Sequence, residues 1–113
     1  MDAGERWRQR WQEISLRAEE AKDSPSAIPA LYAAYRAVGE RDRPMVDAVI
    51  AEAVESDDET ERFDALALVR EFRIQVAKPH LERLAERLKT SDSPGASWER
   101  EKVDRILRQF GTL

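Results

Sequence analysis

Apolar residues recur along this chain at the spacing of an α-helix. Between short polar breaks they fall three or four residues apart, which places them on one face of a helix. Six such stripes cover residues 7–18, 28–38, 46–53, 63–72, 81–88 and 98–110. A break over residues 23–26 separates the first two stripes. The chain lacks β-branched runs that alternate with polar residues, so the pattern predicts an all-α fold of six helices without strands.

The residues at the breaks are those that begin helices. Pro44 and Pro79 suit the first turn of a helix, where a missing N–H costs little. Asp58 is placed to cap the fourth helix, and Glu61, three residues later, completes a capping box. Ser97 is placed to cap the sixth helix. The local chemistry therefore agrees with the apolar pattern.

The stripes repeat with a period of 35 residues. A shift of 35 residues places Trp11 on Val46 and Leu81, and it places Pro44 on Pro79. Three repeat units result, which cover approximately residues 9–43, 44–78 and 79–113. One helical hairpin cannot bury its apolar face alone, whereas stacked hairpins bury a shared one. We therefore expect a single domain over residues 1–113, built as three stacked helical hairpins. An irregular six-helix bundle is the alternative.

Two of the units share a finer pattern. In both, a proline opens the first helix, a Ser-Asp pair forms the turn and an aromatic residue begins the second helix. These residues are Pro44, Ser56, Asp57 and Phe63 in the middle unit and Pro79, Ser91, Asp92 and Trp98 in the last unit. The pattern resembles that of HEAT-like repeats. This resemblance implies an α-solenoid, and HEAT-like proteins typically hold other macromolecules on the surface of their second helices.

Composition narrows the classes of function. The chain has 113 residues with 23 acids and 19 bases, a net charge of -4. This acidity disfavours nucleic acid and membrane surfaces, which attract basic proteins. No apolar stretch resembles a membrane span or a signal peptide. The absence of cysteine excludes disulfides and thiolate metal sites and fits a cytoplasmic protein. The preference for arginine, 15 against 4 lysines, favours a bacterium with a GC-rich genome.

Residues for catalysis are scarce. His80 is the sole histidine, so a zinc set or a catalytic triad lacks partners. The glycine-rich phosphate-binding motifs are absent, and the acids at 57–59 lack the spacing of a calcium loop. We therefore predict no enzyme activity, no metal and no cofactor. Trp11 and Trp98 are expected in the core. Trp7, near the chain end beside arginines, is expected to be partly exposed and a candidate partner contact.

The first candidate surface is acidic. Residues 44–61 contain seven acids and no base, whereas residues 62–113 contain 11 bases and 8 acids. We define the candidate acidic patch as Glu52, Glu55, Asp57, Asp58, Glu59 and Glu61. A solvated face is one interpretation of this segment. The other is a site for a basic partner, because complementary charge speeds encounter and sets specificity.

The second candidate surface follows from the repeat. The 35-residue register aligns Arg70 with Arg105 and Arg73 with Arg108, and Tyr35 continues the row. We call the four arginines the arginine ladder. Arginine and tyrosine are favoured at interfaces, so these five residues are candidate partner-binding residues. Acids placed four residues before Arg105 and Arg108 offer a simpler interpretation, as helix-stabilising pairs.

These observations favour a non-catalytic protein–protein interaction module. Its partner is another protein, and we expect a monomer or weak dimer in the cytoplasm. Small acidic bacterial proteins of HEAT-like type include immunity proteins that bind and block a toxin, and an acidic patch suits a basic nuclease. The alternative is a nucleic-acid-binding helical repeat that uses the arginine ladder, which the net charge disfavours.

Overall fold

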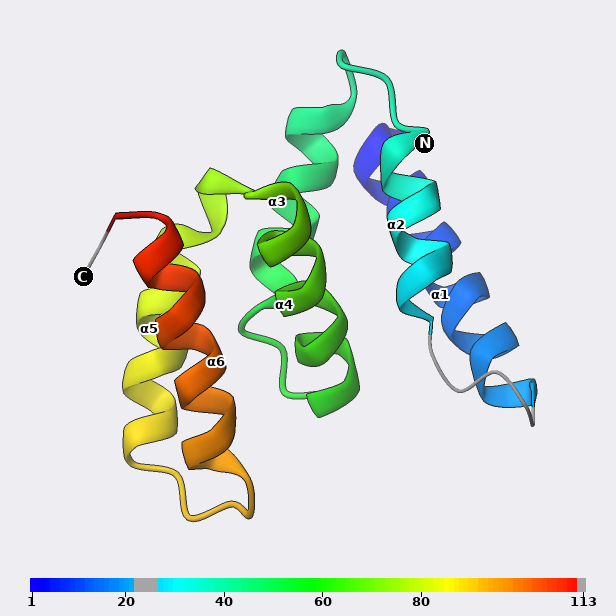
Figure 1. The fold of residues 1–113 in the computed structure, drawn as a ribbon. Coiled ribbons are helices and arrows are strands. Elements are labelled where there is room, and N and C mark those ends of the chain that lie inside the picture. Colours follow the sequence, from blue (N-terminus) through cyan, green and yellow to red (C-terminus); the bar gives the residue numbers. More distant parts are fainter. Residues whose placement is uncertain (22–26, 112–113) are drawn as a thin grey trace. The chain divides into compact units, whose positions relative to one another are not determined.

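Helices account for all of the regular structure in the part of the chain that the structure describes. The computed structural model describes residues 1–21 and 27–111, so the predicted break over residues 23–26 lies outside the described residues. The helices are α1 (Ala3–Glu20), α2 (Ile28–Arg36), α3 (Arg43–Ala53), α4 (Glu59–Phe72), the short 3-10 helix η1 (Gln75–Ala77), α5 (Lys78–Lys89) and α6 (Ala96–Gln109) (Figure 1). The described residues contain no strand, which confirms the all-α prediction and its six helices.

The chain divides into two compact units, Met1–Val49 and Ile50–Leu113, and each is described by itself. The boundary between them falls inside α3. It differs from the predicted repeat boundaries, which follow residues 43 and 78.

The first unit contains α1, α2 and the beginning of α3. Asp2 caps α1 by accepting a hydrogen bond from the backbone N–H of Glu5 at 2.8 Å. The core of this unit is formed by large apolar and aromatic side chains, which are Trp7, Trp11, Ile14, Leu31, Tyr35, Val46 and Val49. A Cβ on Gly4 would meet Cγ2 of Val49 at 3.2 Å. Glycine at this position therefore permits a close approach of α1 to α3.

The second unit contains the end of α3 and the helices α4 to α6. α5 and α6 pack along each other, and α6 also contacts α4 (Figure 1). The fully buried side chains of this unit are aliphatic, and they include Ile50, Leu68, Leu81, Leu84 and Val103. Within α5 the buried residues Leu81, Leu84 and Leu88 follow the three- and four-residue spacing that the sequence predicted for a helical core.

The helix starts match the sequence predictions in part. Pro44 and Pro79 lie in the first turns of α3 and α5. Asp58 caps α4 by accepting from the backbone N–H groups of Thr60 at 2.9 Å and Glu61 at 3.3 Å. The second half of the expected capping box would be a hydrogen bond from the backbone N–H of Asp58 to the Glu61 carboxylate. It is not formed, because this N–H donates to the hydroxyl of Ser56 instead.

The prediction that Ser97 caps α6 is wrong. α6 begins at Ala96, so Ser97 lies inside the helix, and no side chain caps this start. Gly95 precedes the helix with φ 83°, a left-handed conformation that glycine adopts without strain. The backbone N–H of Ala96 donates to the carbonyl of Ser93 at 3.1 Å. A tight turn therefore starts the helix without a side-chain cap.

Candidate partner-binding surfaces

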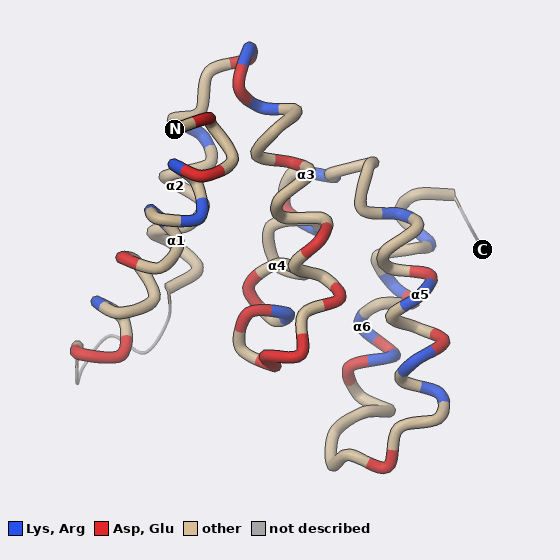
Figure 2. The backbone as a smooth tube through the Cα atoms, turned by 180° about the vertical axis from the view of Figure 1, so that it is seen from behind, with Lys and Arg blue, Asp and Glu red and all other residues tan. Residues whose placement is uncertain are grey.

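The acidic segment gathers at the turn between α3 and α4, where Figure 2 shows a run of acidic positions. Within it, Glu55 is engaged by basic residues of α5. The guanidinium of Arg83 donates to both of its carboxylate oxygens, at 2.9 to 3.1 Å. Nδ1 of His80 lies 2.6 Å from the same carboxylate. Arg87 donates to the backbone carbonyls of Glu55 and Ser56, at 3.0 and 3.2 Å. This part of the acidic patch therefore joins the turn after α3 to α5.

The remaining acids of the patch have different surroundings. Asp58 is occupied as the cap of α4, and Glu61 accepts from the hydroxyl of Ser56. Asp57 forms a long, exposed ion pair with Arg87 at 3.8 Å. Glu52, Asp57 and Glu59 have exposed side chains. The structure thus leaves an exposed acidic surface that is smaller than the segment suggested.

The lowered pKa of Glu55 leads to a prediction of how the stability of the protein depends on pH. The hydrogen bond from Arg83 lowers it below its ordinary value of 4.5, and His80 acts in the same direction while burial opposes both. A carboxyl whose pKa is lower in the folded state adds stability above its unfolded pKa, and this stability is lost as the pH falls through the folded pKa. We expect Glu55→Gln to be less stable than wild type at neutral pH, with a difference that shrinks below pH 4.5.

Urea unfolding at about pH 7 and about pH 3.5 measures this difference. Glu82→Gln, at an exposed position of α5, is the matched control, and it should track wild type at both values. If wild type and Glu55→Gln lost the same amount of stability between the two pH values, the proposed role of this carboxylate would be contradicted.

Tyr35 is not a surface residue, which corrects its place in the predicted binding row. It is 5% exposed, and its hydroxyl donates to the carboxylate of Asp47 at 2.7 Å. The guanidinium of Arg43 lies 5.2 Å from its ring centroid. Burial, more than the bond to Asp47, raises the pKa of the Tyr35 hydroxyl. Tyr35 therefore links α2 to α3 within the first unit and is inaccessible to a partner.

The four arginines of the ladder are exposed. Arg73 follows α4 as its C-cap, with φ 50° in the left-handed region. Arg70 and Arg105 share a neighbour, Lys102 of α6. Burial lowers the pKa of Lys102, and repulsion from Arg105 and Arg70 lowers it further, against the opposite influence of Glu99. The structure therefore brings two ladder arginines near a third cation that the sequence interpretation missed.

Two exposed aromatic rings flank this lysine. The Nζ atom of Lys102 lies 4.3 Å from the ring centroid of Phe63 and 3.9 Å from that of Trp98, both within the range of cation–π attraction. Phe63 is 47% exposed and Trp98 is 61% exposed. We call this surface the aromatic–basic face, and its residues are Phe63 and Arg70 from α4 and Trp98, Lys102 and Arg105 from α6.

The exposure of Trp98 corrects the prediction that it packs in the core. Trp98 and Val103 are five residues apart, which turns them to different faces of α6. Ala96, seven residues before Val103, is buried in its place. The spacing of Trp98, Lys102 and Arg105, four and then three residues, was the signal that places all three on one face.

An ion pair holds the aromatic–basic face together. The guanidinium of Arg62 on α4 donates to both carboxylate oxygens of Glu99 on α6, at 2.8 and 3.1 Å. The two side chains are 11% and 16% exposed. Arg62 also donates to the backbone carbonyl of Ser56 at 3.1 Å. Its bond to Glu99 raises the pKa of the guanidinium. This pair joins α4 to α6 at the residues next to Phe63 and Trp98 in the sequence.

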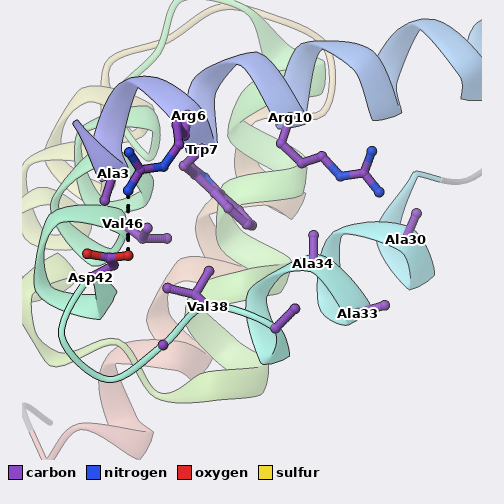
Figure 3. A pocket seen from close by; sticks show the side chains of 12 residues that line it. Ala3, Arg6, Trp7, Arg10, Ala30, Ala33, Ala34, Val38, Asp42 and Val46 are labelled. Carbon is purple, nitrogen blue, oxygen red and sulfur yellow. Dashed lines mark ion pairs between the residues drawn. The ribbon is translucent and has the colours of Figure 1, made fainter. Parts of the chain in front are cut away.

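The first unit carries a groove between α1 and α2 with a volume of about 510 Å³ (Figure 3). Its lining is mostly small and apolar with two arginines, and it consists of Ala3, Arg6, Trp7, Arg10, Ala30, Ala33, Ala34, Ala37, Val38, Gly39, Asp42 and Val46. Arg6 pairs with Asp42 at 3.6 Å, and Arg10 pairs with Glu13 at 3.4 Å. Both pairs are exposed, so they contribute little to stability.

Trp7 forms part of the groove wall, which corrects the prediction that it is partly exposed. It is 4% exposed and lies edge-on to Trp11 and Tyr35, with ring centroids 6.2 and 6.3 Å away. Its Nε1 is buried and has no hydrogen-bond partner among the described residues. A buried donor without an acceptor costs about 1–3 kcal/mol. The cluster that buries this ring therefore leaves one polar atom unsatisfied.

Metal and membrane sites do not emerge from the described residues. Among them, no group of three or more histidine, cysteine, aspartate or glutamate side chains is arranged to hold a metal ion. None of the helices in this part of the chain has the length and apolar character needed to cross a membrane. Comparison of the sequence with protein-family models finds no match, and neither curated proteins nor solved structures match it. The HEAT-like resemblance therefore stays a prediction.

Proposed function

We propose that the chain is a non-catalytic protein-binding module whose contact surface is the aromatic–basic face of α4 and α6. The observation that carries this proposal is the pair of exposed rings, Phe63 and Trp98, on either side of Lys102. Single exposed apolar residues are ordinary on protein surfaces. Two adjacent aromatic side chains with Arg70 and Arg105 beside them have the composition of an interface centre, where aromatic residues and arginine are enriched.

The proposal includes a HEAT-like arrangement of three helical hairpins. Two features support it. The helices follow one another in the predicted first and second positions of each unit. The aromatic–basic face is built from α4 and α6, which are both second helices, the elements that carry the binding surface in HEAT-like proteins. An irregular six-helix bundle remains the alternative arrangement.

The charges of the face favour a partner with an acidic contact surface. Arg70, Lys102 and Arg105 lie close enough for their charges to interact, so an acidic partner would relieve their mutual repulsion. An immunity-type inhibitor of a bacterial toxin is a separate form of a protein-binding module. It would use the exposed acids Glu52, Asp57 and Glu59, in place of the aromatic–basic face, against a basic toxin surface.

Nucleic acid is the second candidate partner, and the same face supports it. Exposed aromatic rings beside cations provide the stacking platform and phosphate contacts that single-stranded nucleic acid binding uses. The net charge of -4 counts against this candidate.

Capture of partners from an extract of the producing cells tests the proposal. We expect the double variant Trp98→Ser/Arg105→Glu to recover at least about tenfold less of the proteins that wild type enriches, because loss of an interface centre removes much of the affinity. Arg17→Glu, at an exposed position of α1, carries the same charge change and should capture them as wild type does. Circular dichroism verifies that both variants remain folded.

Two outcomes would overturn the proposal. Equal capture by wild type and the double variant would exclude the aromatic–basic face as the contact surface. Salt-sensitive binding of a single-stranded DNA oligonucleotide, lost in the double variant while protein capture persists, would assign this face to nucleic acid.

A further inference from the structure

The groove of the first unit has two walls of matching periodicity. One wall is formed by α1 and the other by α2 with its C-cap. The residues of α1 that line it are Ala3, Arg6, Trp7 and Arg10, and those of the second wall are Ala30, Ala33, Ala34 and Ala37. Both sets follow the spacing i, i+3, i+4 and i+7. This is the spacing with which helices contact a third helix that lies along their groove.

The alanine wall permits a close approach. Ala30, Ala33 and Ala37 are exposed, and none of their side chains extends beyond Cβ. The two lining stripes each run over about two turns, or roughly 10 Å of helix. Figure 3 shows Ala30 and Ala34 on the side of α2 that faces Arg6, Trp7 and Arg10 of α1. An elongated surface of this kind suits a helix.

The Trp7 indole is a second and independent observation. Its side chain points from α1 into the space between the two walls (Figure 3). The ring is 4% exposed, and Nε1 lacks a hydrogen-bond partner among the described residues. The ring lines the groove, so an acceptor that enters beside it would satisfy this donor.

The charges at the rim select the occupant. Arg6 and Arg10 are one helical turn apart on the same wall, and Asp42 is the one acid in the lining. Their ion-pair partners, Asp42 and Glu13, are 3.6 and 3.4 Å away at exposed positions, and Arg6 also donates to the backbone carbonyl of Met1 at 3.0 Å. Exposed ion pairs of this kind are readily exchanged. Two carboxylates spaced by one turn on a docked helix would face both guanidinium groups.

We infer that this groove binds an amphipathic, acidic α-helix of a partner protein. The helix presents small apolar residues to the alanine wall and carboxylates to Arg6 and Arg10, and one polar side chain accepts the Nε1–H of Trp7. This site lies on α1 and α2, so it is a second contact surface in addition to the aromatic–basic face. Neither proposal depends on the other.

Titration of the isotope-labelled full chain, followed by nuclear magnetic resonance, tests this inference. The probe is a synthetic helix-forming peptide of about 16 residues, rich in alanine and leucine, with glutamates spaced four residues apart along one edge. We expect shifts of the Trp7 indole N–H and of the backbone amides of Ala30, Ala33 and Ala34. A peptide with lysine in place of each glutamate should bind at least about tenfold more weakly.

Protein variants complete the experiment. Arg6→Gln/Arg10→Gln should weaken binding of the glutamate peptide about tenfold, whereas Arg17→Gln on the same helix should not. Ala33→Phe, at an exposed position, should block the groove without disturbing the core.

Three results would overturn the inference. The first is absence of these shifts at millimolar peptide, and the second is equal binding of the two peptides. The third is that sodium dodecanoate shifts the same resonances as far as the peptide does, which would assign the groove to small amphipathic carboxylates. The variant Trp98→Ser/Arg105→Glu, which alters the aromatic–basic face, should bind the peptide as strongly as wild type does. This result would show that the groove acts independently of the proposed function.

Discussion

Replacement of Leu81 by alanine is expected to lower the free energy of unfolding by about 3 kcal/mol. Leu81 is 0% exposed and lies on the buried face of α5, which packs along α6. The substitution removes three buried carbon atoms, and the surrounding helices cannot close the cavity completely. A domain of this size is stable by about 5–15 kcal/mol, so the loss is a large fraction of the total.

Urea unfolding measures this change, and Leu16→Ala is its control. Leu16 lies on α1 and is 58% exposed, and leucine and alanine both favour helices. The same chemical change at this surface position should therefore alter stability by no more than about 0.5 kcal/mol. Similar losses in the two variants would contradict the placement of Leu81 in the core.

Arg62→Ala is expected to lower the free energy of unfolding by a similar amount, about 3 kcal/mol. The substitution leaves the carboxylate of Glu99, which is 16% exposed, without its bidentate partner. It also removes the donor to the carbonyl of Ser56. A charge left partly buried without a partner costs far more than the intact pair contributes, because its lost hydration is no longer compensated.

Two further variants separate this effect from surface electrostatics. Arg100→Ala removes a partly exposed ion pair with Asp104, whose atoms are 4.0 Å apart, and should cost no more than about 0.5 kcal/mol. Arg62→Met/Glu99→Leu, which replaces both charges with apolar side chains, should recover most of the stability that Arg62→Ala loses. A loss in Arg62→Ala no greater than that in Arg100→Ala would refute the proposed role of the pair.

The helices could be predicted from the sequence because their signals are local. Trp11 and Ile14 are buried on one stripe of α1 as the spacing indicated, and Asp58 caps α4 where its position indicated. Both features depend on residues within about one or two helical turns of each other.

The misplaced site residues depend on distant partners. Tyr35 was assigned to the surface because tyrosine favours interfaces, but its bond to Asp47 joins residues 12 positions apart. Glu55 was assigned to an acidic patch, and Arg83, 28 positions away, neutralises it. Charge counted along a segment cannot register a base that another helix contributes.

Part of the candidate site could nevertheless be predicted from the sequence. The repeat register aligned Phe63 with Trp98 and Arg70 with Arg105, which are four of the five residues of the aromatic–basic face. Because Trp98 is expected in the core, the sequence pattern does not predict this surface. Lys102 was missed because its role comes from rings on two helices, α4 and α6.

The positions of the three tryptophans give each unit its own optical signal. Trp7 and Trp11 are buried in the first unit with ring centroids 6.2 Å apart, so we expect blue-shifted emission from them and a coupled contribution to near-ultraviolet circular dichroism. Trp98 is 61% exposed in the second unit, so we expect it to emit to the red, as an indole in water does. The fluorescence of the unmodified chain should therefore carry a signal from each of its two units.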